Sequence, residues 1–232
     1  MIDSFRINPA TVGGGNITSK NTTTATDNTT ITYSEFTGKG LSFQYPNGWT
    51  INSTATPLAT IPGVDSIEMS DVVNNHLQAQ ILVNLVPLTE EEKGKMNLPN
   101  NATEQDIDSR LQQIFPEHML QPFIKGQTER GSSVLTELGK PVYDKYVVNG
   151  HKAGSAIYTT LTYKIPLKTL FIATITGGNK EFMLMYRAPV DIFDRDLPIA
   201  ENIIKSIVFV NASSNQTDIS EQQQQQQQSI LQ

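Results

Sequence analysis

The hydrophobic and polar positions of this chain change their pattern near residue 33. Before it, the sequence is rich in Thr, Asn and Gly and has few large apolar residues, so it cannot bury enough surface to offset the entropy lost on ordering. After it, residues 41–45 alternate apolar with polar side chains, which is the period of a half-buried strand. We therefore predict a disordered linker over residues 1–32 and a folded domain from residue 33.

Further segments show strand patterns of alternating or β-branched apolar residues. They are residues 66–70, 79–86, 142–148, 153–163, 167–176 and 181–187. Asn149-Gly150 is a dipeptide favoured in two-residue hairpin turns, because both positions need a positive φ. It predicts a hairpin of the third and fourth segments, with His151 exposed beside the turn. Residues 177–179 predict a second hairpin, formed by the last two segments.

One amphipathic helix is predicted between these strands. Thr103 and Asp106 have the spacing of a capping box, and apolar residues follow at helical intervals up to residue 115. Pro116 then interrupts or restarts the helix. The preceding segment, residues 89–100, is polar and predicts a solvated loop.

A second helix is predicted near the end of the domain. Asp196 is placed to cap it and Pro198 suits its first turn. Its buried stripe would consist of Ile199, Ile203 and Ile207. Beyond residue 210 the chain is polar and ends in a glutamine run, so we predict a disordered tail over residues 211–232.

The second hairpin decides the architecture. Phe171 and Ile175 lie on one side of their strand, and Leu170 and Ile172 lie on the other, so both faces are apolar. A sheet with one face in water would instead show polar residues at alternate positions. The fold class predicted for residues 33–210 is therefore α+β, a central antiparallel sheet covered by helices on both faces.

Three stretches carry a resemblance to a known family. The strand that opens at Gly40 and closes with Tyr45-Pro46-x-x-Trp49, together with the segments 180–188 and 198–209, resembles the start and end of PsbP-like domains. The resemblance covers residues 33 to 210 and implies an α/β/α sandwich, a fold shared with a nuclear import factor that binds the GTPase Ran. It implies no active site, because these proteins have no catalytic motif in common.

Composition narrows the classes of partner. The net charge of −6 and the pI near 5.1, without a Lys/Arg cluster, disfavour nucleic acid and anionic membranes as partners. The chain has no cysteine, so a disulfide, a thiolate nucleophile and a Cys-ligated zinc are excluded. No apolar run is long enough to span a bilayer and no signal peptide is recognisable, so no membrane insertion is expected from this chain.

Glycosylation sequons are the argument for export. Asn-x-Ser/Thr occurs seven times. The acceptor candidates are Asn16, Asn21, Asn28, Asn52, Asn101, Asn211 and Asn215. Two interpretations stay open: real glycan acceptors, or the by-product of Thr/Asn-rich composition. With the stalk-like linker and the glutamine tail, the sequons favour an extracellular or cell-surface protein of an archaeon or another microbe.

Catalytic and metal chemistry finds little support in the sequence. Asp71 with His76, and Glu117 with His118, could each give two ligands to a divalent metal, but neither pair has the ligand number or spacing of an established site. No serine has the setting of a nucleophile elbow. We therefore expect no catalytic residue, no bound cofactor and no metal, with those four side chains as the candidates for a site.

Two functions follow as hypotheses. The first is a non-enzymatic, exported accessory or binding domain that docks onto a larger surface or membrane-associated assembly through a protein partner. The alternative is a small-ligand or metal carrier, or an enzyme, with a site assembled around the Asp71/His76 and Glu117/His118 loops. It requires these side chains to converge in one pocket.

Overall fold

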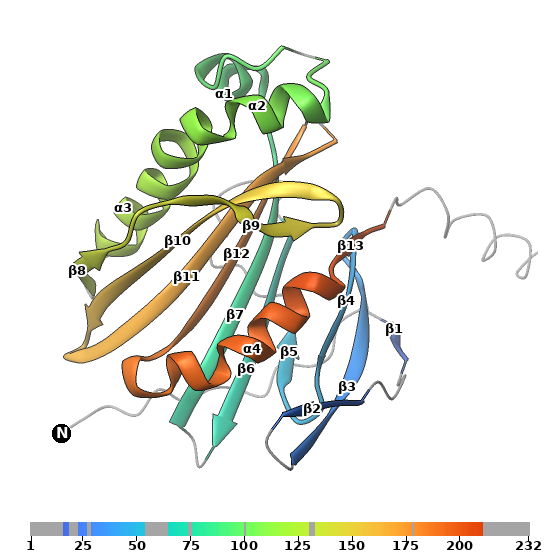
Figure 1. The fold of residues 1–232 in the computed structure, drawn as a ribbon, viewed down its shortest axis with the longest axis vertical. Helices are drawn as coiled ribbons and strands as arrows, with labels where there is room; N and C mark the ends of the chain where they lie inside the picture. Colours follow the sequence, from blue (N-terminus) through green and yellow to red (C-terminus); the bar gives the residue numbers. More distant parts are fainter. Residues whose placement is uncertain are drawn as a thin grey trace, which may run out of the picture.

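The computed structural model describes residues 16–18, 23–26, 29–53, 65–73, 76–99, 101–129, 133–177 and 179–210. Its main feature is an antiparallel sheet of eight strands in the order β5-β6-β7-β12-β11-β10-β8, with β9 also pairing with β10 (Figure 1). The strands are β5 (Thr50–Asn52), β6 (Asp65–Val73), β7 (His76–Pro87), β8 (Ser133–Leu138), β9 (Val142–Val148), β10 (His151–Thr162), β11 (Ile165–Thr176) and β12 (Lys180–Pro189). All predicted strands of the domain are present, and both predicted hairpins are confirmed.

A second, smaller sheet stands beside the main one. Its strands are β1 (Asn16–Thr18), β2 (Thr23–Thr26), β3 (Thr29–Gly38), β4 (Leu41–Pro46) and β13 (Val208–Phe209). The order is β1-β3-β4-β13, with β2 pairing with the other part of β3. The last strand, β13, pairs with β4 near the start of the domain, so the two ends of the domain lie side by side.

Helices cover the main sheet on both faces. They are α1 (Glu90–Lys95), α2 (Glu104–Ile114), the π-helical turn η1 (Phe115–Leu120), α3 (Gln121–Glu129) and α4 (Val190–Ser206). In Figure 1, α4 crosses in front of the sheet, and the helices from the middle of the chain lie toward the opposite side. The predicted α+β sandwich is confirmed.

Two hydrophobic clusters fill the spaces between the layers. The cluster on the α4 side includes Leu170 and Ile172, and the cluster on the side of α2 and η1 includes Phe171 and Ile175. All four side chains are buried. The strand β11 therefore packs on both sides, as its sequence predicted.

The start of α2 follows the prediction closely. Thr103 is the N-cap, its hydroxyl accepts from the backbone N–H of Asp106, and its own backbone N–H donates to the Asp106 carboxylate at 2.8 Å. At Pro116 the chain does not break but widens into the π-turn η1 and continues into α3. A widened turn accommodates the proline because it relieves the clash of the ring with the preceding turn.

The prediction of a solvated loop over residues 89–100 is wrong. Helix α1 begins there, because Thr89 and Glu92 form a second capping box. Three of the polar residues of this segment, Glu90, Glu91 and Glu92, occupy the first turn of the helix. Carboxylates are stabilising at that position because the N-terminus of a helix carries partial positive charge.

The prediction that Asp196 caps the last helix is also wrong. Helix α4 begins at Val190, directly after β12, and Asp196 lies inside it, paired with Arg195 at 2.7 Å. Phe193 is fully buried, and its carbonyl accepts a hydrogen bond from the Tyr186 hydroxyl at 3.0 Å. Packing of this first turn against β12 therefore overrides the local signals that favoured a later start.

The predicted linker over residues 1–32 contains extended structure. Strands β1 and β2 pair with β3, and β3 begins at Thr29, before the expected boundary at residue 33. The threonines that give this stretch its polar composition are β-branched, so they also favour extended backbone. The predicted tail over residues 211–232 lies outside the described residues.

Close packing at Gly154 gives a first prediction. A Cβ built there would lie 2.3 Å from Cδ2 of Phe115, so the ring rests directly on the backbone of β10. We expect Gly154→Ala to lower the free energy of unfolding by about 1–3 kcal/mol through overpacking. Gly126→Ala in α3 meets no atom within 4 Å, so it should be neutral or stabilise by up to about 1 kcal/mol. Urea denaturation of both variants checks this, and equal stabilities would contradict the packing at Gly154.

Candidate functional site

The candidate ligands predicted from the sequence do not form one site. Asp71 on β6 lies on the α4 side of the sheet, on the same face as Met69. Glu117 and His118 lie on η1, on the other face, where Glu117 is exposed and His118 is half-buried. The side chain of His76 lies outside the described residues. The sheet therefore separates Asp71 from Glu117 and His118.

The electrostatics of Asp71 reflect its neighbours on α4. Burial raises the pKa of this carboxyl, Asp196 raises it further, and Arg195 lowers it. In the described part of the chain, no three His, Asp or Glu side chains are arranged to hold a metal ion. The surroundings of Asp71 are therefore those of a group packed beside a helix.

His151 differs from its predicted exposed position. Its side chain is only 11% exposed, and Nε2 lies 3.8 Å from a carboxylate oxygen of Glu104. The imidazole also lies 5.8 Å from the ring of Phe209 on β13. The terminal strand covers the hairpin here, which a local turn signal cannot reveal.

The predicted glycan acceptors are only partly within the described residues. Asn101 is exposed just before α2, Asn52 is half-buried on β5, and Asn16 is in β1. The remaining four, Asn21, Asn28, Asn211 and Asn215, lie outside the described residues. Asn101 is therefore the acceptor with an exposed side chain on the folded domain.

Exposed apolar side chains gather at one corner of the main sheet, where β10 turns into β11 beside β8. We call this the apolar corner and define it by Val134, Leu161, Tyr163 and Ile165, which are 40% to 68% exposed. Leu161 stands directly opposite Val134 on β8. Leu138, further along β8, is also exposed. Leu161 and Val134 point to one face of the sheet, and Ile165, which stands opposite Thr162, points to the other, so the group surrounds this edge. A single exposed apolar residue needs no explanation, but several gathered at one edge indicate an interaction surface.

The turn at this corner is conformationally costly. Tyr163 and Lys164 have φ values of 49° and 68°, and a left-handed backbone at residues other than glycine costs about 1–2 kcal/mol each. The other tight hairpin of this sheet has Asn149 and Gly150 at the equivalent positions, where the same conformation is nearly free. The strained turn holds an aromatic ring out in solvent, which is an arrangement common at functional sites.

Beside the apolar corner, the sheet has an open edge. Within the described residues, β8 pairs only with β10, so its outer backbone groups have no strand beside them. Helix α3 packs against one face of β8 and leaves this edge uncovered (Figure 1). An exposed edge with apolar side chains can accept an extended segment of another chain.

Comparisons with known proteins find solved structures that are similar to this chain in fold. No protein-family model and no curated protein matches the chain. Cyanobacterial PsbP (CyanoP) from Synechocystis sp. PCC 6803 is 14% identical, with 88% of this chain and 97% of that chain covered and a TM-score of 0.45. The Ran-binding protein Mog1p of Saccharomyces cerevisiae is 9% identical, with 79% and 98% covered and a TM-score of 0.43. LpqN, involved in cell envelope biogenesis of Mycobacterium tuberculosis, is 9% identical, with 74% and 83% covered and a TM-score of 0.39.

The predicted resemblance to PsbP-like proteins is confirmed as one of fold alone. At these identities the likeness carries nothing about activity or partner. No helix among the described residues combines the length and apolarity needed to cross a bilayer. Function must therefore be argued from the surfaces and buried groups of this chain.

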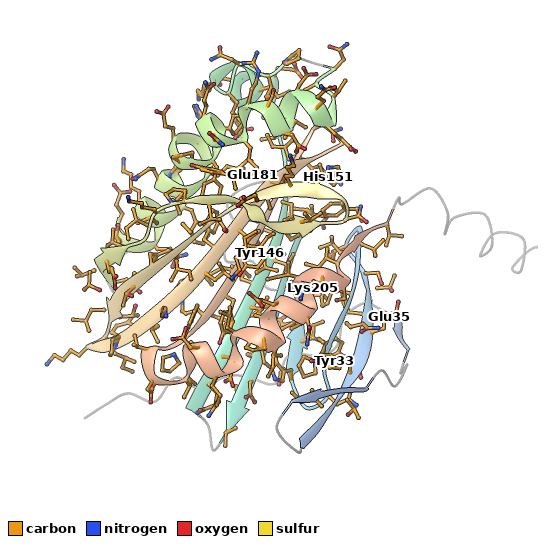
Figure 2. All side chains as sticks on the ribbon, in the orientation of Figure 1. Tyr33, Glu35, Tyr146, His151, Glu181 and Lys205 are labelled. Atoms are coloured by element: carbon orange, nitrogen blue, oxygen red, sulfur yellow. The ribbon has the colours of Figure 1, made fainter. Side chains whose placement is uncertain are left out.

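A buried carboxyl lies at the other end of the sheet from the apolar corner. Glu181 on β12, labelled in Figure 2, is 9% exposed and points to the face covered by α2, η1 and α3. Burial, followed by the charge of Glu92, raises the pKa of Glu181 to about 8. The group is therefore protonated in the folded protein near neutral pH, while it would be ionised in the unfolded chain.

This shift predicts a pH dependence of stability. Between the ordinary pKa of a glutamate and about 8, the folded state binds one more proton than the unfolded state, so stability falls as the pH rises. Relative to Glu181→Gln, the wild type should lose roughly 3 kcal/mol of unfolding free energy between pH 5 and pH 8. Urea unfolding across this range measures the difference. Glu117→Gln, which changes an exposed carboxyl, should keep the wild-type profile, and a parallel profile for Glu181→Gln would contradict the shift.

Proposed function

We propose that this protein is a non-enzymatic, exported binding domain that docks onto a larger surface or membrane-associated assembly. Its partner is a protein, and the domain takes an extended segment of that partner along the free edge of β8. The observation that carries the proposal is the apolar corner next to this edge. Here backbone groups without a neighbouring strand supply hydrogen bonds, and flanking apolar side chains supply burial.

Tyr163 has the features of an anchor residue. It is the most exposed member of the apolar corner, at 68%. It projects from a turn whose two central residues have strained, left-handed backbone conformations. Tyrosine is enriched among residues that dominate binding energy, because it buries a large rigid ring at a small cost in entropy. The contact would therefore centre on this ring, with Val134 and Leu161 beside it.

The alternative function is a carrier or an enzyme built around Asp71, His76, Glu117 and His118. It needs these side chains in one pocket, and the sheet between Asp71 and the η1 pair leaves it without a specific observation in its favour. The docking proposal, in contrast, accounts for the exposed apolar side chains, the strained turn and the free edge of β8.

The strained turn allows a sharp test of docking. Replacing Tyr163-Lys164 with Asn-Gly removes the anchor and relieves the left-handed strain, so the variant should be more stable by about 1 kcal/mol and bind its partner more weakly. Affinity capture from native material, with bound proteins compared between variants, measures binding, and thermal unfolding measures stability.

Val73→Thr is the matched control, because Val73 is exposed on β6, away from the apolar corner. A protein that is retained by the wild type and by Val73→Thr, and lost by the Asn-Gly variant, supports docking at the apolar corner. Equal capture by all three proteins contradicts it. A dimer in light scattering that the Asn-Gly variant abolishes would make the occupant a second copy of this chain instead.

Export is tested through Asn101. If the protein is exported in a glycosylating organism, intact mass spectrometry of material from its native source should show hexose-scale additions, and Asn101→Gln should remove one of them. Thr103→Ser keeps both the sequon and a hydroxyl N-cap for α2, so it should keep the modification. An unmodified wild-type mass would make the sequons a consequence of composition and would count against export.

A further inference from the structure

A row of polar side chains crosses the face of the main sheet that α2, η1 and α3 cover. Tyr158 on β10 stands opposite Thr169 on β11, and Thr169 stands opposite Arg187 on β12. Opposed residues on antiparallel strands point to the same face with Cβ atoms about 5 Å apart, so the three side chains are neighbours. The row lies beside Phe171, whose ring stacks on Phe123 of α3 with centroids 4.4 Å apart.

Arg187 brings a positive charge into this row, and Glu68 acts on that charge without forming an ion pair with it. Its Nη2 donates to Oε1 of Gln127 on α3 at 3.0 Å and to Sδ of Met185 at 3.2 Å, and both acceptors are neutral. No carboxylate of the described residues forms an ion pair with the guanidinium. Its buried Nε has no acceptor.

The two hydroxyls in the row are also unpartnered. Tyr158 and Thr169 are 1% and 0% exposed, and neither hydroxyl oxygen has a hydrogen-bond partner. Burial raises the pKa of Tyr158, while the charge of Arg187 and weak hydrogen-bond contacts with Thr169 and Arg187 lower it, so the three groups lie close together. The Tyr158 hydroxyl, the Thr169 hydroxyl and Nε of Arg187 therefore lie near one another, but none of these three atoms has a partner at the distance and angle of a full hydrogen bond.

This arrangement is costly unless something completes it. A buried donor left without an acceptor costs about 1–3 kcal/mol, and more if it is charged. Burial lowers the pKa of Arg187, but a guanidinium stays protonated in proteins. Its charge therefore cannot be removed by loss of a proton, whereas a buried carboxylate is neutralised by gaining one. One acceptor placed between the three groups would receive a hydrogen bond from each of them. Arg187 and Gln127 are only half-buried, which leaves an approach from the surface.

We propose that Arg187, Tyr158 and Thr169 form a binding site for a monoanionic carboxylate. A guanidinium and two hydroxyls supply three donors and one positive charge, which a single carboxylate matches. Glu68 lies near enough to act on the charge of Arg187, and its Oε1 accepts from Gln80 at 2.6 Å. Because Glu68 already opposes part of the Arg187 charge, a dianion such as phosphate would leave more excess negative charge at the site than a carboxylate does, so it fits less well. The site is independent of docking at the apolar corner.

Sodium acetate is the probe for this site. We expect saturation-transfer NMR on the acetate methyl protons to show saturable binding to the full-length protein at constant ionic strength. Tyr158→Phe and Thr169→Val each remove one donor with little change of shape, and each should weaken binding about tenfold. Arg187→Met should abolish it. Lys125→Met, which removes an exposed cation from α3, should bind acetate as the wild type does.

The outcomes separate this site from non-specific attraction and from a buried water. Loss of binding in the Tyr158 and Thr169 variants, with Lys125→Met unchanged, supports the proposal even if Arg187→Met fails to fold. Equal binding by all variants, or no saturable signal in the wild type, overturns it. Displacement of acetate by phosphate at pH 7.5 with higher affinity would overturn the preference for a monoanion.

Discussion

The structure depends on the burial of both faces of the β11–β12 hairpin. These strands carry apolar side chains at successive positions, so neither face can be left in water. The covers come from two separate parts of the chain: the segment between β7 and β8 supplies α2, η1 and α3, and the segment after β12 supplies α4. The smaller sheet then packs beside α4, because β13 follows that helix directly and pairs with β4.

Covering the second face also fixes the β9–β10 hairpin. Tyr146 on β9 donates from its hydroxyl to Glu201 on α4 at 3.0 Å, and Figure 2 shows it between the hairpin and that helix. Lys145 pairs with the same carboxylate at 3.0 Å. The hairpin therefore closes over α4 at one end of β10. At the other end, β10 and β11 extend past the helix, which leaves the apolar corner exposed.

The sequence predicted those parts of the fold that depend on period and on local chemistry. The apolar faces of β11 and β12, the Asn149-Gly150 turn and the Thr103 capping box could all be read from neighbouring residues. The first turn of α4 could not, because it depends on the contact of Phe193 with β12. The candidate sites were missed for the same reason. Tyr158, Thr169 and Arg187 come from three strands, and only the register places them in one row.

Two ionisable groups of β12 are buried on the face that α2, η1 and α3 cover, and the protein meets the cost of their burial in different ways. Glu181 and Arg187 point to this face from opposite ends of the strand, with Met183 and Met185 between them. Six residues of strand span about 20 Å, so the two charges cannot neutralise each other. Glu181 avoids the cost of burial by holding a proton, as its raised pKa shows. Arg187 has no such route, since a guanidinium does not lose its proton. Glu68 acts on the charge of Arg187 but forms no ion pair with it, so a ligand that brings a negative charge into direct contact with the guanidinium would complete the proposed site.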